Sequence, residues 1–143
     1  MRIIAGKFKG RRLKTPKTDV IRPTIDRVKE SVFSILQNQN TNAKFLDLCA
    51  GSGSIGLEAI SRGAESVTFV DQHSGAIQLI RFNLNLCGLD AKIHRIQLRR
   101  STAQKAIKAL GYKSESYDLI YFYPPYDSGI YEEIGRASGR ERV

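Results

Sequence analysis

The fold is decided by residues 44–56, which read Lys-Phe-Leu-Asp-Leu-Cys-Ala-Gly-Ser-Gly-Ser-Ile-Gly. Residues 44–49 predict a buried strand, and residues 51–56, called the glycine turn below, match G-x-G-x-x-G. The pattern is weak alone, but here it follows the predicted strand and opens a helix predicted near 55–62, which is the context of a ligand-binding turn. Its glycines let the chain turn tightly and let a ligand lie against bare backbone.

The chain after this turn continues to alternate strands with helices. Further strands are predicted at 66–71, 92–98 and 117–123. A helix opened by Ser74 has Ile77, Ile80 and Leu84 on one face, and a helix capped by Ser101 has Ala103, Ala106, Ile107 and Leu110 on one face. This alternation predicts an α/β fold with a doubly wound, Rossmann-like parallel sheet. Ligands bind such sheets beyond the carboxyl ends of the strands.

The segment before residue 44 has a different character. Residues 2–14 predict a hairpin of two short strands around Gly6 and Gly10, with apolar anchors at Ile3, Ile4 and Leu13. Thr24 is predicted to cap a helix whose apolar positions are Ile25, Val28, Val32 and either Ile35 or Leu36. Residues 37–42 form a polar break before the first strand.

Positive charge is concentrated at the start of the chain. The net charge is +9, and residues 1–30, with ten basic and three acidic side chains, contribute +7 of it. A basic segment on a nearly neutral body indicates a polyanionic partner such as nucleic acid. The alternative is a solvated surface that only favours solubility. The candidate nucleic-acid contacts are Arg2, Lys7, Lys9, Arg11, Arg12 and Lys14.

Two carboxylates accompany the glycine turn. Asp71 ends the second predicted strand, 20 residues after Gly51, where an acid can accept hydrogen bonds from both hydroxyls of a ribose. Asp47 lies inside the first strand, where it could order the amides of the turn or meet a cationic group of the ligand. These features admit a nicotinamide or flavin dinucleotide as well as S-adenosylmethionine.

The segment after the last predicted strand separates these ligand classes. It reads Tyr123-Pro124-Pro125-Tyr126. The prolines stiffen the chain and remove two N–H donors, which leaves carbonyl oxygens as the available groups. An acceptor-rich turn beside an aromatic ring suits a flat base that carries an exocyclic amine, and Tyr126 could stack on that base. We therefore expect S-adenosylmethionine and a nucleobase substrate.

Together these motifs resemble the bacterial 16S ribosomal RNA guanine-N2 methyltransferases, a family of class I S-adenosylmethionine-dependent enzymes. The resemblance covers residues 1 to about 132 and rests on residues 2–6, 11–13, 22–30, 45–56, 70–71 and 124–126. It implies a class I methyltransferase fold and methyl transfer to the exocyclic N2 of a guanine. It also implies 16S ribosomal RNA or the small ribosomal subunit particle as partner, and a cytoplasmic monomer.

The resemblance implies roles for individual residues. The reacting base would meet Tyr123, Pro124, Pro125 and Tyr126, and the cofactor would meet Thr24, Asp47, Gly51, Gly53, Ser54, Asp71 and Gln72. The hairpin would contact the RNA through the six basic residues named above. The family has Asp where this chain has Tyr123, and a phenol is bulkier and uncharged near neutral pH. Residues 98–101 also lack the acid or amide with which the third strand commonly ends. A DNA adenine-N6 methyltransferase and a non-catalytic RNA- or cofactor-binding remnant are the alternatives.

Three regions are expected. Residues 1–23 form the RNA-contacting hairpin and loop, and residues 24–132 form a partial S-adenosylmethionine-binding domain that is incomplete at its C-terminus. Residues 133–143 resemble a translated sequencing adapter and are expected not to be native; the alternative is a genuine basic tail. Cys49 and Cys87 are expected to be reduced thiols. No stretch approaches the ~18–20 apolar residues of a membrane span, and we expect no metal site.

Overall fold

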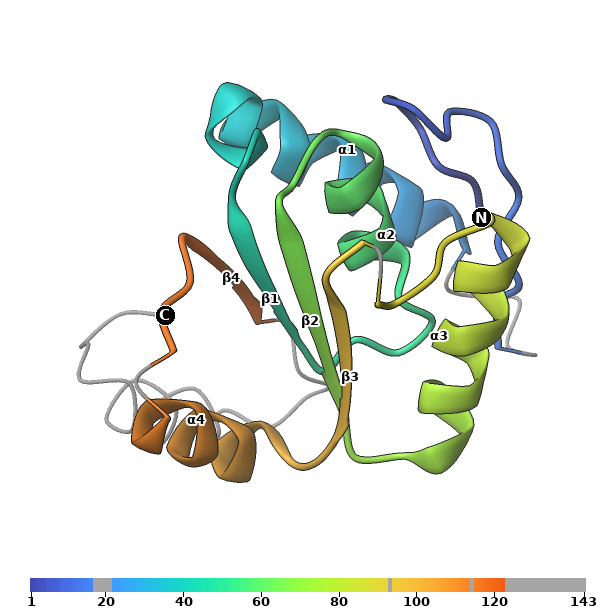
Figure 1. The fold of residues 1–143 in the computed structure, drawn as a ribbon. Coiled ribbons are helices and arrows are strands. Elements are labelled where there is room, and N and C mark those ends of the chain that lie inside the picture. Colours follow the sequence, from blue (N-terminus) through green and yellow to red (C-terminus); the bar gives the residue numbers. More distant parts are fainter. Residues whose placement is uncertain (17–21, 93, 114, 123–143) are drawn as a thin grey trace.

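The computed structural model describes residues 1–16, 22–92, 94–113 and 115–122. Its centre is a sheet of four parallel strands in the order β3-β2-β1-β4 (Figure 1). The strands are β1 (Lys44–Leu48), β2 (Ser66–Asp71), β3 (Ile96–Arg100) and β4 (Leu119–Phe122). The predicted α/β fold with a parallel sheet is confirmed.

Helices cover both faces of this sheet. They are α1 (Arg22–Leu36), α2 (Ser54–Ser61), α3 (Ser74–Leu86) and α4 (Ala103–Tyr112), and a short 3-10 helix, η2 (Gln37–Asn40), follows α1. Figure 1 shows α4 apart from the other three helices. Alternate strand residues face opposite sides, so Phe45 packs with the core that includes α1, α2 and α3, whereas Leu46 packs against α4.

Several predicted boundaries are corrected by the structure. The third strand starts at Ile96 and not at residue 92, because Arg95 has a positive φ of 54° and the Ile96 N–H bonds to the Ala91 carbonyl in a turn. The helix α4 is capped by Thr102 and not by Ser101, since the Thr102 side chain accepts from the Lys105 N–H at 3.2 Å. The apolar residues predicted to face the core on α3 and α4 are buried there.

The helix α1 also differs from its prediction. It starts at Arg22, so Thr24 lies inside its first turn and does not cap it. Pro23 fits this first turn because the initial N–H groups of a helix have no acceptor within it. Ile35 is 79% exposed and therefore lies on the solvent side, whereas Leu36 packs against the core.

Residues 1–16, called the basic arm below, form a docked loop and not the two predicted strands. A single antiparallel bridge joins Arg2 to Arg12. Beside it, the Ile3 N–H bonds to the Arg11 carbonyl and the Leu13 N–H to the Met1 carbonyl. Ile3 and Leu13 are buried in the core shared with α1, α2 and α3, and Ile4 is only half-buried. The arm therefore packs onto the body through two of its three predicted anchors.

Candidate functional site

The glycine turn connects β1 to α2 at the carboxyl edge of the sheet. Gly51 has a φ of 58°, and a Cβ built on it would meet nothing within 4 Å. Its backbone therefore faces open space, as a turn that receives a ligand requires. Gly56 serves packing, because a Cβ there would lie 2.2 Å from Cε1 of the buried Phe69 ring.

Asp71, the last residue of β2, lies beside this turn. Its carboxylate is buried, with the residue 8% exposed, and its Oδ2 accepts the Gly51 N–H at 2.9 Å. Its Oδ1 accepts the His73 N–H at 3.0 Å and lies 3.0 Å from His73 Nδ1. The structure thus brings Asp71 and the turn together, and it adds His73, to which the sequence analysis gave no role in this site.

Asp47 supports the same turn from within the sheet. It is 1% exposed, and its Oδ2 accepts the Gly56 N–H at 3.2 Å in the first turn of α2. Burial raises the pKa of Asp47 to about 8, although the Gly56 hydrogen bond acts in the opposite direction. Of the two predicted roles, ordering the turn amides is the one that this hydrogen bond serves.

A cavity of about 810 Å³ opens beside Gly51 and Asp71. One wall comes from α3 and the segment before it, and another comes from the end of the basic arm. The ring of Phe82, which is 46% exposed, lies 4.9 Å from the Lys14 Nζ. The lining residues are Lys14, Thr15, Pro16, Gly51, Asp71, His73, Gly75, Ala76, Gln78, Leu79 and Phe82. Sequence reasoning assigned the arm to RNA alone and missed its place in this wall.

The cavity is not lined by Gly53, Ser54 or Gln72, three other residues predicted to meet the cofactor. Ser54 is buried, and its Oγ accepts the Lys29 Nζ at 3.0 Å. Gln72 is exposed beside Asp71, and its backbone carbonyl accepts Arg100 Nε at 3.3 Å. Gly53 adopts a φ of 82° just before α2. The side chain of Thr24 lies outside what the structure describes.

The predicted base-binding residues 123–126 lie outside the described residues. The strand before them, β4, pairs with β1 in parallel, and Phe122 at its end is the register partner of Leu48. The last described residue of this strand therefore lies at the same edge of the sheet as the glycine turn.

The basic arm presents all of its predicted RNA contacts to solvent. The side chains of Arg2, Lys7, Lys9, Arg11, Arg12 and Lys14 are exposed. Arg11 also donates from Nη1 to the Leu86 carbonyl at 3.1 Å, which ties it to the end of α3. Between these cations the arm backbone is held by hydrogen bonds to α2, for example from the Lys7 N–H to the Ser61 carbonyl at 2.8 Å.

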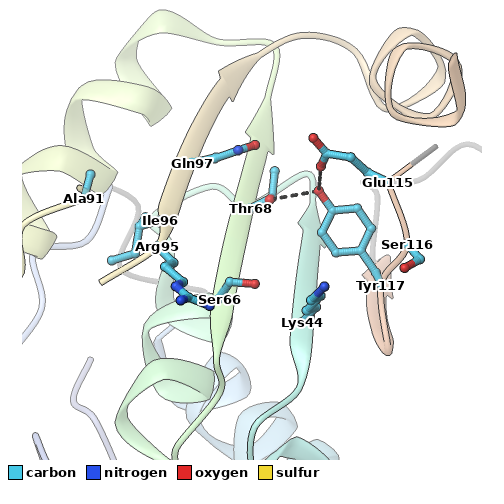
Figure 2. A pocket seen from close by; sticks show the side chains of 10 residues that line it. All are labelled: Lys44, Ser66, Thr68, Ala91, Arg95, Ile96, Gln97, Glu115, Ser116 and Tyr117. Carbon is cyan, nitrogen blue, oxygen red and sulfur yellow. Dashed lines mark hydrogen bonds between the residues drawn. The ribbon is translucent and has the colours of Figure 1, made fainter. Parts of the chain in front are cut away.

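A second cavity, of about 620 Å³, lies nearer the amino ends of the strands (Figure 2). Tyr117 lines this cavity. Its phenol oxygen lies 3.0 Å from Thr68 Oγ1 and donates to Glu115 Oε2 at 3.1 Å. Burial raises the pKa of Tyr117. No sequence pattern noted above indicates this cavity. Within the described ranges, no cluster of three or more His, Cys, Asp or Glu side chains could hold a metal ion, and no helix is long and apolar enough to span a membrane.

The chain is similar in sequence to ribosomal RNA methyltransferases. Ribosomal RNA small subunit methyltransferase D of Escherichia coli strain K12 is 36% identical over 134 residues, which cover 93% of this chain and 64% of that protein. YlbH of Bacillus subtilis strain 168 is 40% identical over 126 residues, which cover 88% and 67%. The chain thus spans about two thirds of the length of these curated relatives.

A solved structure of a hypothetical protein from Thermus thermophilus superposes with a TM-score of 0.82 at 27% identity, covering 96% of this chain and 78% of that one. The predicted Rossmann-like fold of the class I methyltransferases is confirmed. The family model described as Conserved hypothetical protein 95 matches residues 1–139. The chain therefore belongs to the Conserved hypothetical protein 95 family, which confirms its resemblance to the small-subunit rRNA methyltransferases.

Proposed function

We propose that this chain carries the cofactor-binding and RNA-contacting parts of an S-adenosylmethionine-dependent rRNA methyltransferase. The observation that carries the proposal is the juxtaposition at the carboxyl edge: the Asp71 carboxylate, the bare backbone of Gly51 and the end of the basic arm line one cavity. The Escherichia coli relative is named as a ribosomal RNA small subunit methyltransferase, and this name supports the proposed class of activity.

The donor set of this cavity fits the cofactor. Both Asp71 oxygens are held in place, Oδ1 by the His73 N–H and Nδ1 and Oδ2 by the Gly51 N–H, and Oδ2 keeps a lone pair that can accept a hydroxyl hydrogen of a ribose. The open backbone at Gly51 admits close approach of the ligand. When bound, S-adenosylmethionine would supply an electrophilic methyl group. The work of the chain is then to bind, to orient and to exclude water.

For the substrate, we propose the exocyclic N2 of a guanine in small-subunit ribosomal RNA. The exposed cations of the basic arm would contact phosphates, so RNA affinity should fall steeply with salt concentration. Residues 123–126 would receive a base that has left its stack. Asp71 and the Gly51 backbone would hold S-adenosylmethionine while its methyl group is donated to N2, and N2 would release one proton to water. We further propose that the protein acts as a monomer in the cytoplasm, either on 16S ribosomal RNA or on the small ribosomal subunit particle.

The test is Asp71→Ala, compared with Asp118→Ala. Both carboxylates accept a backbone N–H, but Asp118 binds the Lys44 N–H at the amino edge, far from the glycine turn along the strand. We expect Asp71→Ala to weaken S-adenosylmethionine binding by about tenfold or more in calorimetry, because charged hydrogen bonds are lost. Affinity for small-subunit rRNA should stay unchanged in both variants. Unchanged cofactor affinity in Asp71→Ala would remove Asp71 from the site.

A further inference from the structure

Asn83 on α3 joins the basic arm to the glycine turn. Its side chain is fully buried, at 0% exposure. Its Oδ1 accepts the Lys14 N–H at 2.8 Å, and its Nδ2 donates to the Lys14 carbonyl at 3.0 Å and to the Ser52 carbonyl at 2.9 Å. One amide group therefore holds both backbone groups of an arm residue and one carbonyl of the turn.

Lys29 on α1 makes a second connection of the same kind. It is also 0% exposed, and its ammonium donates to the Arg2 carbonyl in the arm and to Ser54 Oγ in the turn. Its charge is balanced by the buried Glu58, whose Oε1 lies 3.3 Å away. Glu58 in turn accepts the Ile4 and Ala5 N–H groups of the arm at 2.9 and 3.0 Å.

These contacts make movement of the arm and movement of the turn interdependent. If the arm lifts away, Asn83 and Lys29 lose partners on the arm and remain as buried polar groups beside the turn. Buried polar groups without partners are unfavourable, so the connected state is the stable one. Asn83 also holds Lys14 in the wall of the cavity that Asp71 lines.

We propose that Asn83 is a positioning residue that couples cofactor binding to RNA binding. By holding Lys14 against Ser52, it keeps one cavity wall in place for the cofactor and fixes the arm cations for the RNA. A ligand that orders either side then favours binding on the other, and the coupling must be equal in both directions. This inference rests on the proposed function, because it takes the cavity as the cofactor site and the arm as the RNA contact.

The experiment compares Asn83→Ala with Asn40→Ala. Asn40 is a matched control: it is 1% exposed and donates to the Ala59 carbonyl at 3.0 Å, with no bond to the arm or the glycine turn. In the unmodified protein, S-adenosylhomocysteine and small-subunit rRNA should each raise the affinity for the other by the same factor, about fivefold or more. Asn83→Ala should abolish this coupling, weaken S-adenosylhomocysteine binding about tenfold, and speed tryptic cleavage within the arm. Asn40→Ala should retain coupling and cofactor affinity even where its thermal stability falls.

A measurement on the unmodified protein covers the case in which Asn83→Ala does not fold. Saturating S-adenosylhomocysteine should slow hydrogen exchange of the Lys14 amide about tenfold, while the Lys105 amide at the start of α4 serves as the reference. Unchanged hydrogen exchange at the Lys14 amide, or equal coupling in Asn83→Ala and Asn40→Ala, would overturn the inference about Asn83 and leave the proposed function intact. Failure of the unmodified protein to bind S-adenosylhomocysteine at all would instead contradict the proposed function.

Discussion

The two edges of the sheet each carry a cavity, of about 810 Å³ at the carboxyl edge and about 620 Å³ nearer the amino ends. At the carboxyl edge, the buried side chains of Asp47 and Asp71 accept backbone N–H groups of the glycine turn. In the second cavity, polar side chains such as Tyr117 and Glu115 bond mainly to one another (Figure 2). The two cavities are thus comparable in volume, but the first lies beside a glycine turn whose backbone is held by buried side chains, whereas the polar groups of the second mainly hold one another.

The direction of the strands explains the difference. Each of α2, α3 and α4 begins after a strand ends, so all three helices present their amino ends at the carboxyl edge. The first N–H groups of a helix lack partners within it and carry partial positive charge, which favours carboxylates and polar ligands there. We therefore expect substitutions at that edge to have larger effects on stability and on cofactor binding than substitutions in the second cavity.

The largest effect is expected at Gly56. A Cβ added there would lie 2.2 Å from the Phe69 ring, which is fully buried and cannot move aside. Gly56→Ala should therefore lower the free energy of unfolding by about 3 kcal/mol. In contrast, Gly111→Ala in α4 meets nothing within 4 Å and should be neutral or slightly stabilising. Urea denaturation of both variants measures this difference, and equal midpoints would contradict it.

The next effect concerns catalysis at the same edge. The resemblance places an aspartate where this chain has Tyr123, as the side-chain acceptor for the amine of the base. Tyr123→Asp should raise methyl transfer about a hundredfold, because an aligned charged acceptor stabilises the developing positive charge on the amine. Tritium transfer from labelled S-adenosylmethionine to small-subunit rRNA gives the measurement. Equal transfer by both proteins would refute the role given to this position.

A smaller effect is expected from the titration of Asp47. Burial raises its pKa from 3.8 to about 8, so between these values the folded protein retains a proton that the unfolded chain releases. Stability should therefore fall as pH rises, by on the order of 2 kcal/mol between pH 5 and pH 7. Asp47→Asn should remove this fall, whereas Asp118→Asn at the amino edge should leave it in place. The check is urea unfolding at three pH values; an identical pH dependence in Asp47→Asn would show that another group is responsible.

The smallest effect is expected in the second cavity. Tyr117→Phe deletes a hydroxyl that bonds to Thr68 and Glu115. We expect a loss of about 1 kcal/mol in stability and no change in S-adenosylhomocysteine affinity. Thermal unfolding and calorimetry measure the two quantities. A large loss of cofactor affinity would mean that both edges of the sheet take part in binding.

Local patterns predicted much of this protein because they depend on neighbours along the chain. The strand at 66–71 was predicted at its observed bounds, and the glycine turn was placed correctly between β1 and α2. Ile77, Ile80 and Leu84 were predicted on the buried face of α3, since helical periodicity is a property of the segment itself. Asp71 and the turn were both predicted at carboxyl ends of strands, and the structure adds the hydrogen bond from the Gly51 N–H to Asp71.

Other features depend on partners that are distant in sequence. The start of β3 was misplaced because a turn at Arg95 with positive φ leaves little trace in the hydrophobic pattern. Lys29 counted as one more positive charge of the N-terminal segment, yet the structure buries it completely beside Glu58.

The amino-acid order alone was sufficient for the class of fold and the family, and it predicted the edge at which we propose that the cofactor binds, because periodicity, glycine spacing and strand direction are local. Only the folded molecule showed that the arm forms a wall of the cavity and that Asn83 connects it to the turn. An asparagine on a helix has no pattern that marks it as an anchor. Its role arises from the two carbonyls and one N–H that packing brings within 3.0 Å of its side chain.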